Sequence, residues 1–153
     1  MHNISDTKHI LLKYCKEYVD QRQQKIIDTI ADLQQSLTTE TKSTAGDKHE
    51  TGRAMLQLER EKAGVQLAEI QKLQEIVNKI DITISSGNIR LGSLVVTSEG
   101  TYFISLPIGI YTLNQESFFI IAVNSPIGRV LLGKKIGDTI RFRDKNIFIK
   151  AVY

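Results

Sequence analysis

The spacing of apolar residues changes near residue 81 of this 153-residue chain. Before that point they recur at steps of three and four, which is the period of an amphipathic α-helix. After it they form short runs rich in β-branched and aromatic residues, which is typical of strands. The sequence therefore predicts an α+β protein with a helical part at residues 1–80 and a β-rich part at residues 81–153.

Two apolar stripes run through residues 1–80, and each is long enough for a helix of about 30 residues, roughly 45 Å in length. The polar stretch Thr38–Gly46 separates them. Two long amphipathic helices joined by a polar turn predict an antiparallel coiled-coil hairpin with its tip near residues 38–50. Because the stripes are narrow, we expect a finger that projects into solvent, although two chains paired as a four-helix bundle would satisfy the same pattern. The stripes are Leu12, Cys15, Val19, Ile26, Ile30, Leu33 and Leu37, then Leu56, Ala63, Leu67, Ile70, Leu73, Val77 and Ile80.

Residues 81–153 predict a small antiparallel sheet with one short helix. Glu99-Gly100 and Asp144–Asn146 have the composition of hairpin turns. Further along, Ser125 can cap a helix, Pro126 suits its first turn and Gly133 suits its end. The expected strands are Ile82–Ile84, Ser93–Thr97, Thr101–Leu106, Phe118–Val123, Thr139–Phe142 and Ile147–Val152.

The charge is divided unevenly between the two parts. Residues 1–80 hold 12 Lys/Arg and 12 Asp/Glu, whereas residues 81–153 hold 8 and 5, so the net charge of +3 lies in the second part. A weak positive charge favours an acidic protein surface or nucleic acid as a partner.

Other features exclude several classes of protein. The lone cysteine, Cys15, excludes an intramolecular disulfide and fits a buried small hydrophobe. No apolar run is long enough to span a bilayer, and residues 1–14 lack the apolar core of a secretion signal, so we expect a cytoplasmic protein without a membrane partner. The sequence holds no Gly-rich phosphate loop, no zinc-ligand spacing and no Ser/His/Asp set, and no independent enzyme is predicted.

The segment Ser125–Asp138, SPIGRVLLGKKIGD, resembles the signature of the GreA/GreB transcription elongation factors of bacteria. In that family a Ser-Pro-Ile start, an Arg, a Gly-Lys pair and a Gly-Asp occur in this order just before the last two strands. The stretch Ile89–Val96 is similar to the family's first strand, and the order of a helical hairpin followed by a β-rich domain also agrees. The resemblance covers residues 85–153 and, less closely, residues 40–80.

This resemblance implies an FKBP-like C-terminal domain that docks on RNA polymerase. The residues that would carry polymerase binding are Ser125, Pro126, Ile127, Arg129 and Lys134. The alternative for Arg129 and Lys134 is that they are simply solvated charges at the end of a helix.

The stretch Gly46–Glu50 resembles the tip of the family's finger, where a Gly-Asp is followed by a second acidic residue three positions after the Asp. The resemblance implies that Asp47 and Glu50 enter the polymerase's secondary channel, help to hold a Mg²⁺ ion shared with the polymerase active site, and so assist cleavage of a backtracked RNA 3′ end. Hard oxygen ligands suit Mg²⁺ at such a two-metal site. Two carboxylates are too few to hold Mg²⁺ stably on the chain alone, and the polymerase would perform the hydrolysis.

Alternatives remain open at the tip. Asp47 and Glu50 also have the spacing of a capping box, in which both side chains satisfy backbone donors of the second helix. The cations Lys42, Lys48 and Arg53 would contact RNA phosphates or the channel, or be solvated. The stretch Thr51–Ala54 departs from the family, which has an acidic and an aromatic residue there. A channel-binding regulator without cleavage activity and a coiled-coil module that self-associates are therefore alternatives.

Overall fold

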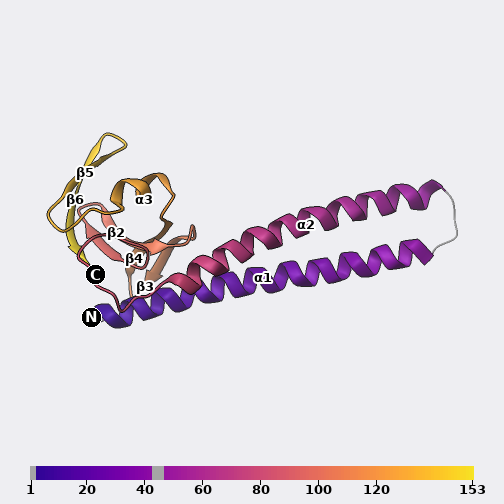
Figure 1. Ribbon diagram of the computed structural model, residues 1–153, viewed down its shortest axis with the longest axis horizontal. Helices are drawn as coiled ribbons and strands as arrows, with labels where there is room; N and C mark the ends of the chain where they lie inside the picture. The colour runs from indigo at the N-terminus through magenta and orange to yellow at the C-terminus, as the bar shows by residue number, and fades with distance from the viewer. Residues whose placement is uncertain (1–2, 43–46) are drawn as a thin grey trace. The chain divides into compact units, whose positions relative to one another are not determined.

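The computed structural model describes the backbone of residues 3–42 and 47–153, with side chains outside residues 40–50. Within these residues the chain is α+β, as predicted, with two long helices, six strands and one short helix (Figure 1). It forms two compact units. The helical unit is residues 17–75, and the sheet unit combines residues 1–16 with residues 76–153. The division differs from a boundary at residue 80, because the start of the first helix packs within the sheet unit.

The helical unit contains most of α1 (Ile4–Lys42) and of α2 (Asp47–Lys79). The two helices run side by side in opposite directions within it (Figure 1). Gln35, Ser36 and Thr39 of α1 line a shallow depression together with Leu56 of α2, which confirms that the helices are neighbours there. Members of the two predicted stripes are buried along this unit, including Val19, Leu37, Ala63 and Ile70.

The sheet unit holds one six-stranded sheet in the order β3-β4-β2-β1-β6-β5. Four neighbouring pairs are antiparallel, and β2 runs parallel to β4, with Phe103 opposite Ile120. The bounds are β1 Leu94–Thr97, β2 Gly100–Ser105, β3 Gly109–Leu113, β4 Glu116–Ala122, α3 Pro126–Leu131, β5 Thr139–Phe142 and β6 Lys145–Val152.

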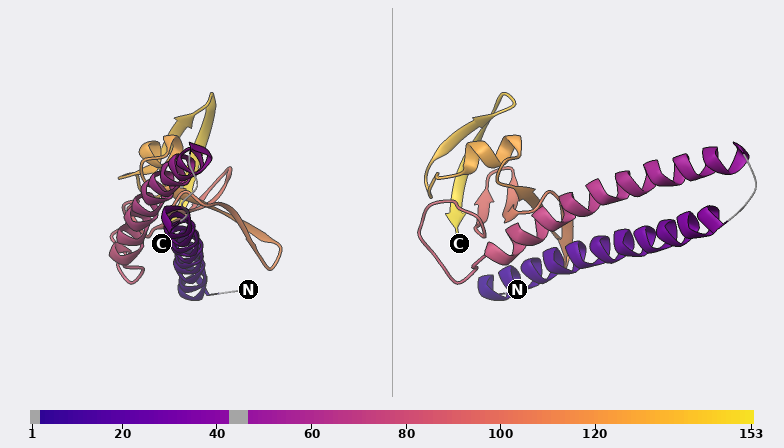
Figure 2. Two further views of the ribbon diagram at one scale, coloured as in Figure 1. Left: turned by 90° about the vertical axis from the view of Figure 1, so that its right-hand side faces the viewer. Right: turned by 45° about the vertical axis from the view of Figure 1, so that its right-hand side comes forward.

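Both faces of this sheet bury apolar side chains. Helix α3 places Leu131 in a core on one face, and Figure 2 shows α3 beside the strands in two further views. On the other face, Cys15 of α1 lies with its Sγ 3.5 Å from Ser105 Oγ, and the rings of Tyr14 and Tyr111 are 4.3 Å apart between centroids. Cys15 is fully buried, which confirms its expected role as a small core residue. The core on the α3 face contains Ile89, Val95, Ile104, Leu131, Ile140, Ile147 and Ile149.

The predicted polar turn at Thr38–Gly46 is too long, because α1 continues to Lys42. The hydroxyls of Thr38 and Thr39 donate to the carbonyls of Gln34 and Gln35 at 3.0 and 3.1 Å. Hydroxyls that bond back to the preceding turn are satisfied without leaving the helix. The polar residues at the end of α1 are therefore compatible with a helix, and their composition did not show that the helix had ended.

The strand predicted at Ile82–Ile84 is wrong. Asp81 accepts hydrogen bonds from both the backbone N–H and the hydroxyl of Thr83, which forms an Asx turn in place of extended pairing. The last hairpin turns at Arg143-Asp144, one residue earlier than expected, and both residues have positive φ, as a tight two-residue turn between right-twisted strands requires. Two further differences are that β3 was not predicted and that the β2–β4 pair makes the sheet mixed rather than antiparallel.

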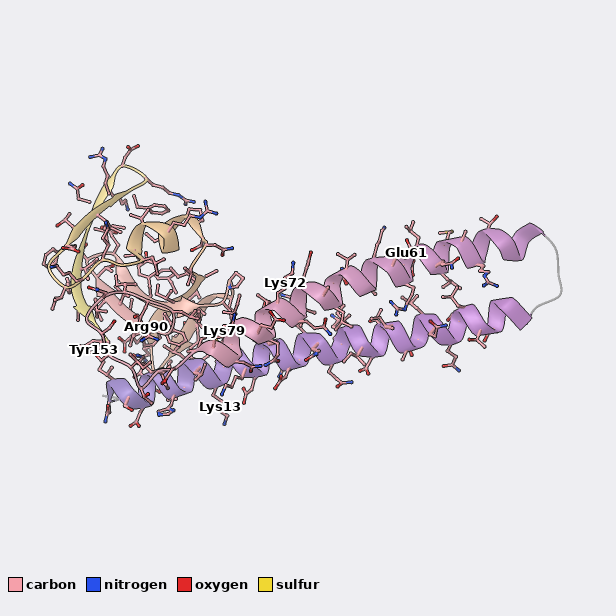
Figure 3. The ribbon with its side chains drawn as sticks, in the orientation of Figure 1. Lys13, Glu61, Lys72, Lys79, Arg90 and Tyr153 are labelled. Carbon is pink, nitrogen blue, oxygen red and sulfur yellow. The ribbon has the colours of Figure 1, made fainter. Side chains whose placement is uncertain are left out.

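Lys8 of α1 is a charged residue inside the sheet unit, where it is only 5 % exposed. Burial lowers the pKa of its ammonium and the nearby Arg90, labelled in Figure 3, lowers it further, whereas the carboxylate of Asp81 raises it. A lysine whose folded pKa is lowered disfavours folding while it is charged. Its cost is present below the folded pKa and is relieved as pH rises from there toward the unfolded value of 10.5.

Replacing Lys8 by methionine should therefore raise the free energy of unfolding at pH 7 by about 1 kcal/mol, because an apolar side chain of similar length removes a buried charge. It should also remove the part of the stability gain that wild type shows as pH rises toward 10.5. Urea unfolding at several pH values measures both effects. Lys16→Met, at an exposed position on α1, is the control. Equal effects of the two substitutions, or a loss of stability in Lys8→Met, would contradict the prediction.

Candidate partner-docking site

The start of α3 is built by a capping serine and by a glycine whose position leaves no room for a Cβ without a shift of the backbone. Ser125 Oγ accepts a hydrogen bond from Gly128 N at 3.1 Å and donates one to the carbonyl of Ala122 at 2.6 Å. A Cβ on Gly128 would lie 2.2 Å from that same carbonyl oxygen and 2.8 Å from the carbonyl of Val123. Ser125 and Gly128 thus shape the turn between β4 and α3, and the Ser125 hydroxyl is occupied by backbone partners.

The segment after α3 is held by backbone hydrogen bonds. Gly133 N donates to the carbonyl of Ile89 at 2.8 Å, and Ile89 N donates to the carbonyl of Lys134 at 2.7 Å. Asp138 accepts from Lys135 N at 2.9 Å through its Oδ2, and the backbone of Asp138 pairs with Ile149. These bonds tie the segment to the segment around Ile89 and to β6. They leave the side chains of its middle residues to solvent.

The exposed side chains of this segment form a mixed apolar and basic set, which we call the docking surface. Leu132 is 45 % exposed and Ile136 is 62 % exposed, although large apolar residues are usually covered. The cations of the same segment are exposed as well, so the segment offers both apolar and basic side chains to a partner. The docking surface consists of Arg129, Leu132, Lys134, Lys135 and Ile136.

The residues predicted to bind polymerase therefore divide into two groups. Arg129 and Lys134 are exposed and belong to the docking surface, and Pro126 is exposed next to it at the first turn of α3. Ser125 is a helix cap, and Ile127 is half-buried against the core. Ser125 and Ile127 would therefore act on a partner only by fixing the position of α3.

Sequence reasoning missed Leu132 and Ile136 as surface residues. The available signal was the pair Leu131-Leu132, because consecutive residues of a helix differ by about 100° in direction and the second of two such residues can fall outside the face that the first buries. Leu131 is fully buried, so Leu132 is turned outward.

The predicted tip residues lie mostly outside the described side chains. Lys42, Asp47, Lys48 and Glu50 have no described side-chain position, and Arg53 is exposed on α2. Helix α2 begins at Asp47. The backbone of Asp47 and of Glu50 therefore belongs to the first turn of this helix.

No group of three or more His, Cys, Asp or Glu side chains suited to a metal occurs within the described residues. Among the described helices, none is long and apolar enough to cross a membrane.

Comparison with known proteins adds little. The chain matches no protein-family model, and curated proteins give no match either. A solved structure described as that of the transcription factor Gfh1 aligns with 90 % of this chain and 92 % of its own, at 17 % identity and a TM-score of 0.35. At this TM-score the likeness carries no weight for either fold or function.

Proposed function

We propose that this chain is a Gre-type transcription elongation factor that binds bacterial RNA polymerase at the secondary channel and stimulates cleavage of backtracked RNA. The segment Ser125–Asp138 carries the proposal, because it resembles the GreA/GreB signature and presents the docking surface. Two apolar and three basic side chains suit a partner surface that is acidic and partly apolar.

The two units would have different roles in this function. The sheet unit docks through Arg129 and Lys134, and the paired helices carry Asp47 and Glu50 into the channel. A narrow helical pair reaches a recessed site that a globular domain cannot enter. The two carboxylates would share a Mg²⁺ ion with the polymerase and orient water beside the RNA 3′ end. The chain alone would have no nuclease activity, and no metal is expected to stay bound to it.

The test is an RNA-cleavage assay on a stalled, backtracked complex of the cognate polymerase, with and without the protein. Shortened transcripts that can be re-extended are expected only when the protein and Mg²⁺ are both present. A pull-down on the same preparation measures binding. Binding without cleavage would reject the cleavage role, and absence of binding would reject the proposal as a whole.

Charge reversal on the docking surface should weaken polymerase binding at least about tenfold, because interface arginines are frequent hot spots and like charges repel an acidic partner. The variant is Arg129→Glu with Lys134→Glu. The matched control is Arg143→Glu with Lys145→Glu, which reverses the same two residue types at exposed positions elsewhere on the sheet unit, and it should bind polymerase as wild type does. Equal loss in both double variants would indicate nonspecific charge attraction and contradict the assignment of the surface.

A regulator that binds the channel without promoting cleavage is the second candidate. It is favoured by Thr51–Ala54, where Arg53 and Ala54 stand in place of the family's usual acidic and aromatic residues and Gly52 weakens the first turns of α2. This candidate predicts changes in transcription that depend on the tip, with no shortened transcripts in the same assay.

Self-association through the helices is the third candidate. Met55, Leu58 and Val65 of α2 are 62, 53 and 61 % exposed, so α2 carries apolar side chains beyond those buried in the helical unit. Glu61 and Lys72, labelled in Figure 3, are exposed on the same helix. A dimer in light scattering, abolished by Leu58→Lys, together with no retention on polymerase, would favour this candidate over the others.

A further inference from the structure

Strands β5 and β6 display an unusual row of side chains on the face turned away from α3. Ile140, Ile147 and Ile149 point into the core that contains Leu131 of α3. Side chains alternate between the two faces of a strand, and the burial of β5 and β6 alternates accordingly. The exposed set, which we call the β5–β6 outer face, is Thr139, Arg141, Asn146, Phe148 and Lys150.

Strand register places an aromatic ring between two cations on this face. Phe148 is paired with Thr139, and Arg141 is paired with Asn146. Arg141 is therefore a diagonal neighbour of Phe148, at about 7–8 Å between such positions. Lys150 follows Phe148 two residues along β6, at roughly 7 Å. The ring is 44 % exposed, and the Arg141 side chain is 69 % exposed.

Protection of a sheet edge explains only part of this arrangement. Charged side chains on an edge strand discourage pairing with other chains, which accounts for Arg141 because β5 is at the edge. It does not account for Phe148 and Lys150, because β6 is paired on both sides, with β5 and with β1. Protection of the edge therefore leaves Phe148 and Lys150 unassigned.

Ion pairing does not neutralise the face either. None of its five residues is acidic. Asp144, at the hairpin turn, lies 3.6 Å from Arg141, but the two side chains are 98 and 69 % exposed. Such an exposed pair is weak and screened by salt, so a phosphate can replace the carboxylate.

We propose that the β5–β6 outer face binds single-stranded RNA. A base stacks on Phe148, and the phosphates on either side of it meet Arg141 and Lys150. An aromatic ring between cations is the arrangement by which sheets bind single strands, since every base has a π-face and every linkage carries a negative charge. Thr139 and Asn146 supply polar groups for the 2′-hydroxyl or a base edge. This site is independent of the proposed polymerase role.

The test uses the full chain, without polymerase, and fluorescein-labelled oligouridylate in a fluorescence-anisotropy titration at low salt. Two phosphate contacts predict that the logarithm of the binding constant falls with the logarithm of salt concentration with a slope of about −1.4. Phe148→Ala should weaken binding roughly 5- to 100-fold, because it removes one stacked base. Lys150→Glu should weaken binding and make the slope shallower by about 0.7.

Two further variants keep the result interpretable. Phe148→Tyr retains a stacking ring and should bind as wild type does, which separates stacking from a folding defect. Lys134→Glu changes the docking surface by the same charge as Lys150→Glu and should leave RNA binding nearly unchanged. A loss as large in Lys134→Glu as in Lys150→Glu would overturn the assignment of the site to this face.

Three other outcomes would overturn the proposal. Wild-type affinity in Phe148→Ala would reduce the interaction to nonspecific charge attraction. Equal or tighter binding of duplex RNA would exclude base stacking as its basis. Equal or tighter binding of oligothymidylate would exclude RNA as the preferred ligand. Since the assay contains no polymerase, its failure leaves the proposed elongation role untouched.

Discussion

Replacing Gly128 by alanine is expected to destabilise the sheet unit by about 3 kcal/mol, at the upper end of the usual cost of overpacking. A Cβ at this position would lie 2.2 Å from the Ala122 carbonyl oxygen, 2.8 Å from the Val123 carbonyl oxygen and 2.8 Å from Ser125 Oγ. Two of these atoms belong to the backbone and cannot rotate away. Relief of the clash would move the turn that leads into α3, and with it Leu131, which is fully buried in the core.

Urea unfolding followed by tyrosine fluorescence measures the loss, since four of the five tyrosines lie in the sheet unit. Gly133→Ala is the matched control. Gly133 has a φ of +80° but no atom within 4 Å of an added Cβ, so only the left-handed backbone is strained. That strain costs about 1–2 kcal/mol. A loss in Gly128→Ala no larger than in Gly133→Ala would contradict a steric role for Gly128.

Removal of both tip carboxylates is expected to abolish stimulated cleavage, if the proposed function holds, while polymerase binding is retained. Asp47→Ala with Glu50→Ala should reduce cleavage to the rate of polymerase alone, because the chain then supplies no oxygen ligand to the shared Mg²⁺. Each single variant should need a higher Mg²⁺ concentration for half-maximal cleavage than wild type does. The backtracked complex described above provides the assay, and the Mg²⁺ titration separates a metal role from a capping role.

The matched control removes two carboxylates from the same helix outside its first turn. Glu61→Ala with Glu69→Ala changes the charge of α2 equally, and both residues are exposed. It should cleave as wild type does. Loss of α-helical circular dichroism in Asp47→Ala with Glu50→Ala, with an unchanged Mg²⁺ requirement, would instead support a capping box. Unchanged cleavage in that variant would reject the metal role.

The fold class was predictable because it depends on local periodicity. Apolar steps of three and four identified α1 and α2, and β-branched runs identified five of the six strands. The short helix was predictable for the same reason, since Ser125, Pro126 and Gly133 act on the backbone within one turn of themselves. Strand β3, at Gly109–Leu113, was missed because its short run follows Pro107 and opens on a glycine.

Long-range pairing was not predictable from these patterns. The parallel match of β2 with β4 joins strands that a hairpin cannot connect, and nothing in their composition specifies direction. The inclusion of residues 1–16 in the sheet unit also depends on long-range packing, and local patterns did not predict it. Leu11 and Cys15 have the spacing of a helix–helix stripe, but Cys15 lies against Ser105 of a strand 90 residues away.

For the candidate sites too, local sequence patterns gave one part of the picture and the tertiary structure gave the other. Residue types and spacing in Ser125–Asp138 and Gly46–Glu50 led to the prediction of a partner, because motifs are local, and that partner stays a prediction. Only the tertiary structure separated Ser125, which is occupied as a cap, from Arg129 and Lys134, which are exposed. Likewise, Phe148 and Lys150 became a candidate RNA site only when the strand register placed them on one face with Arg141. Periodicity states which residues share an element, whereas exposure and cross-strand neighbours depend on what the rest of the chain covers.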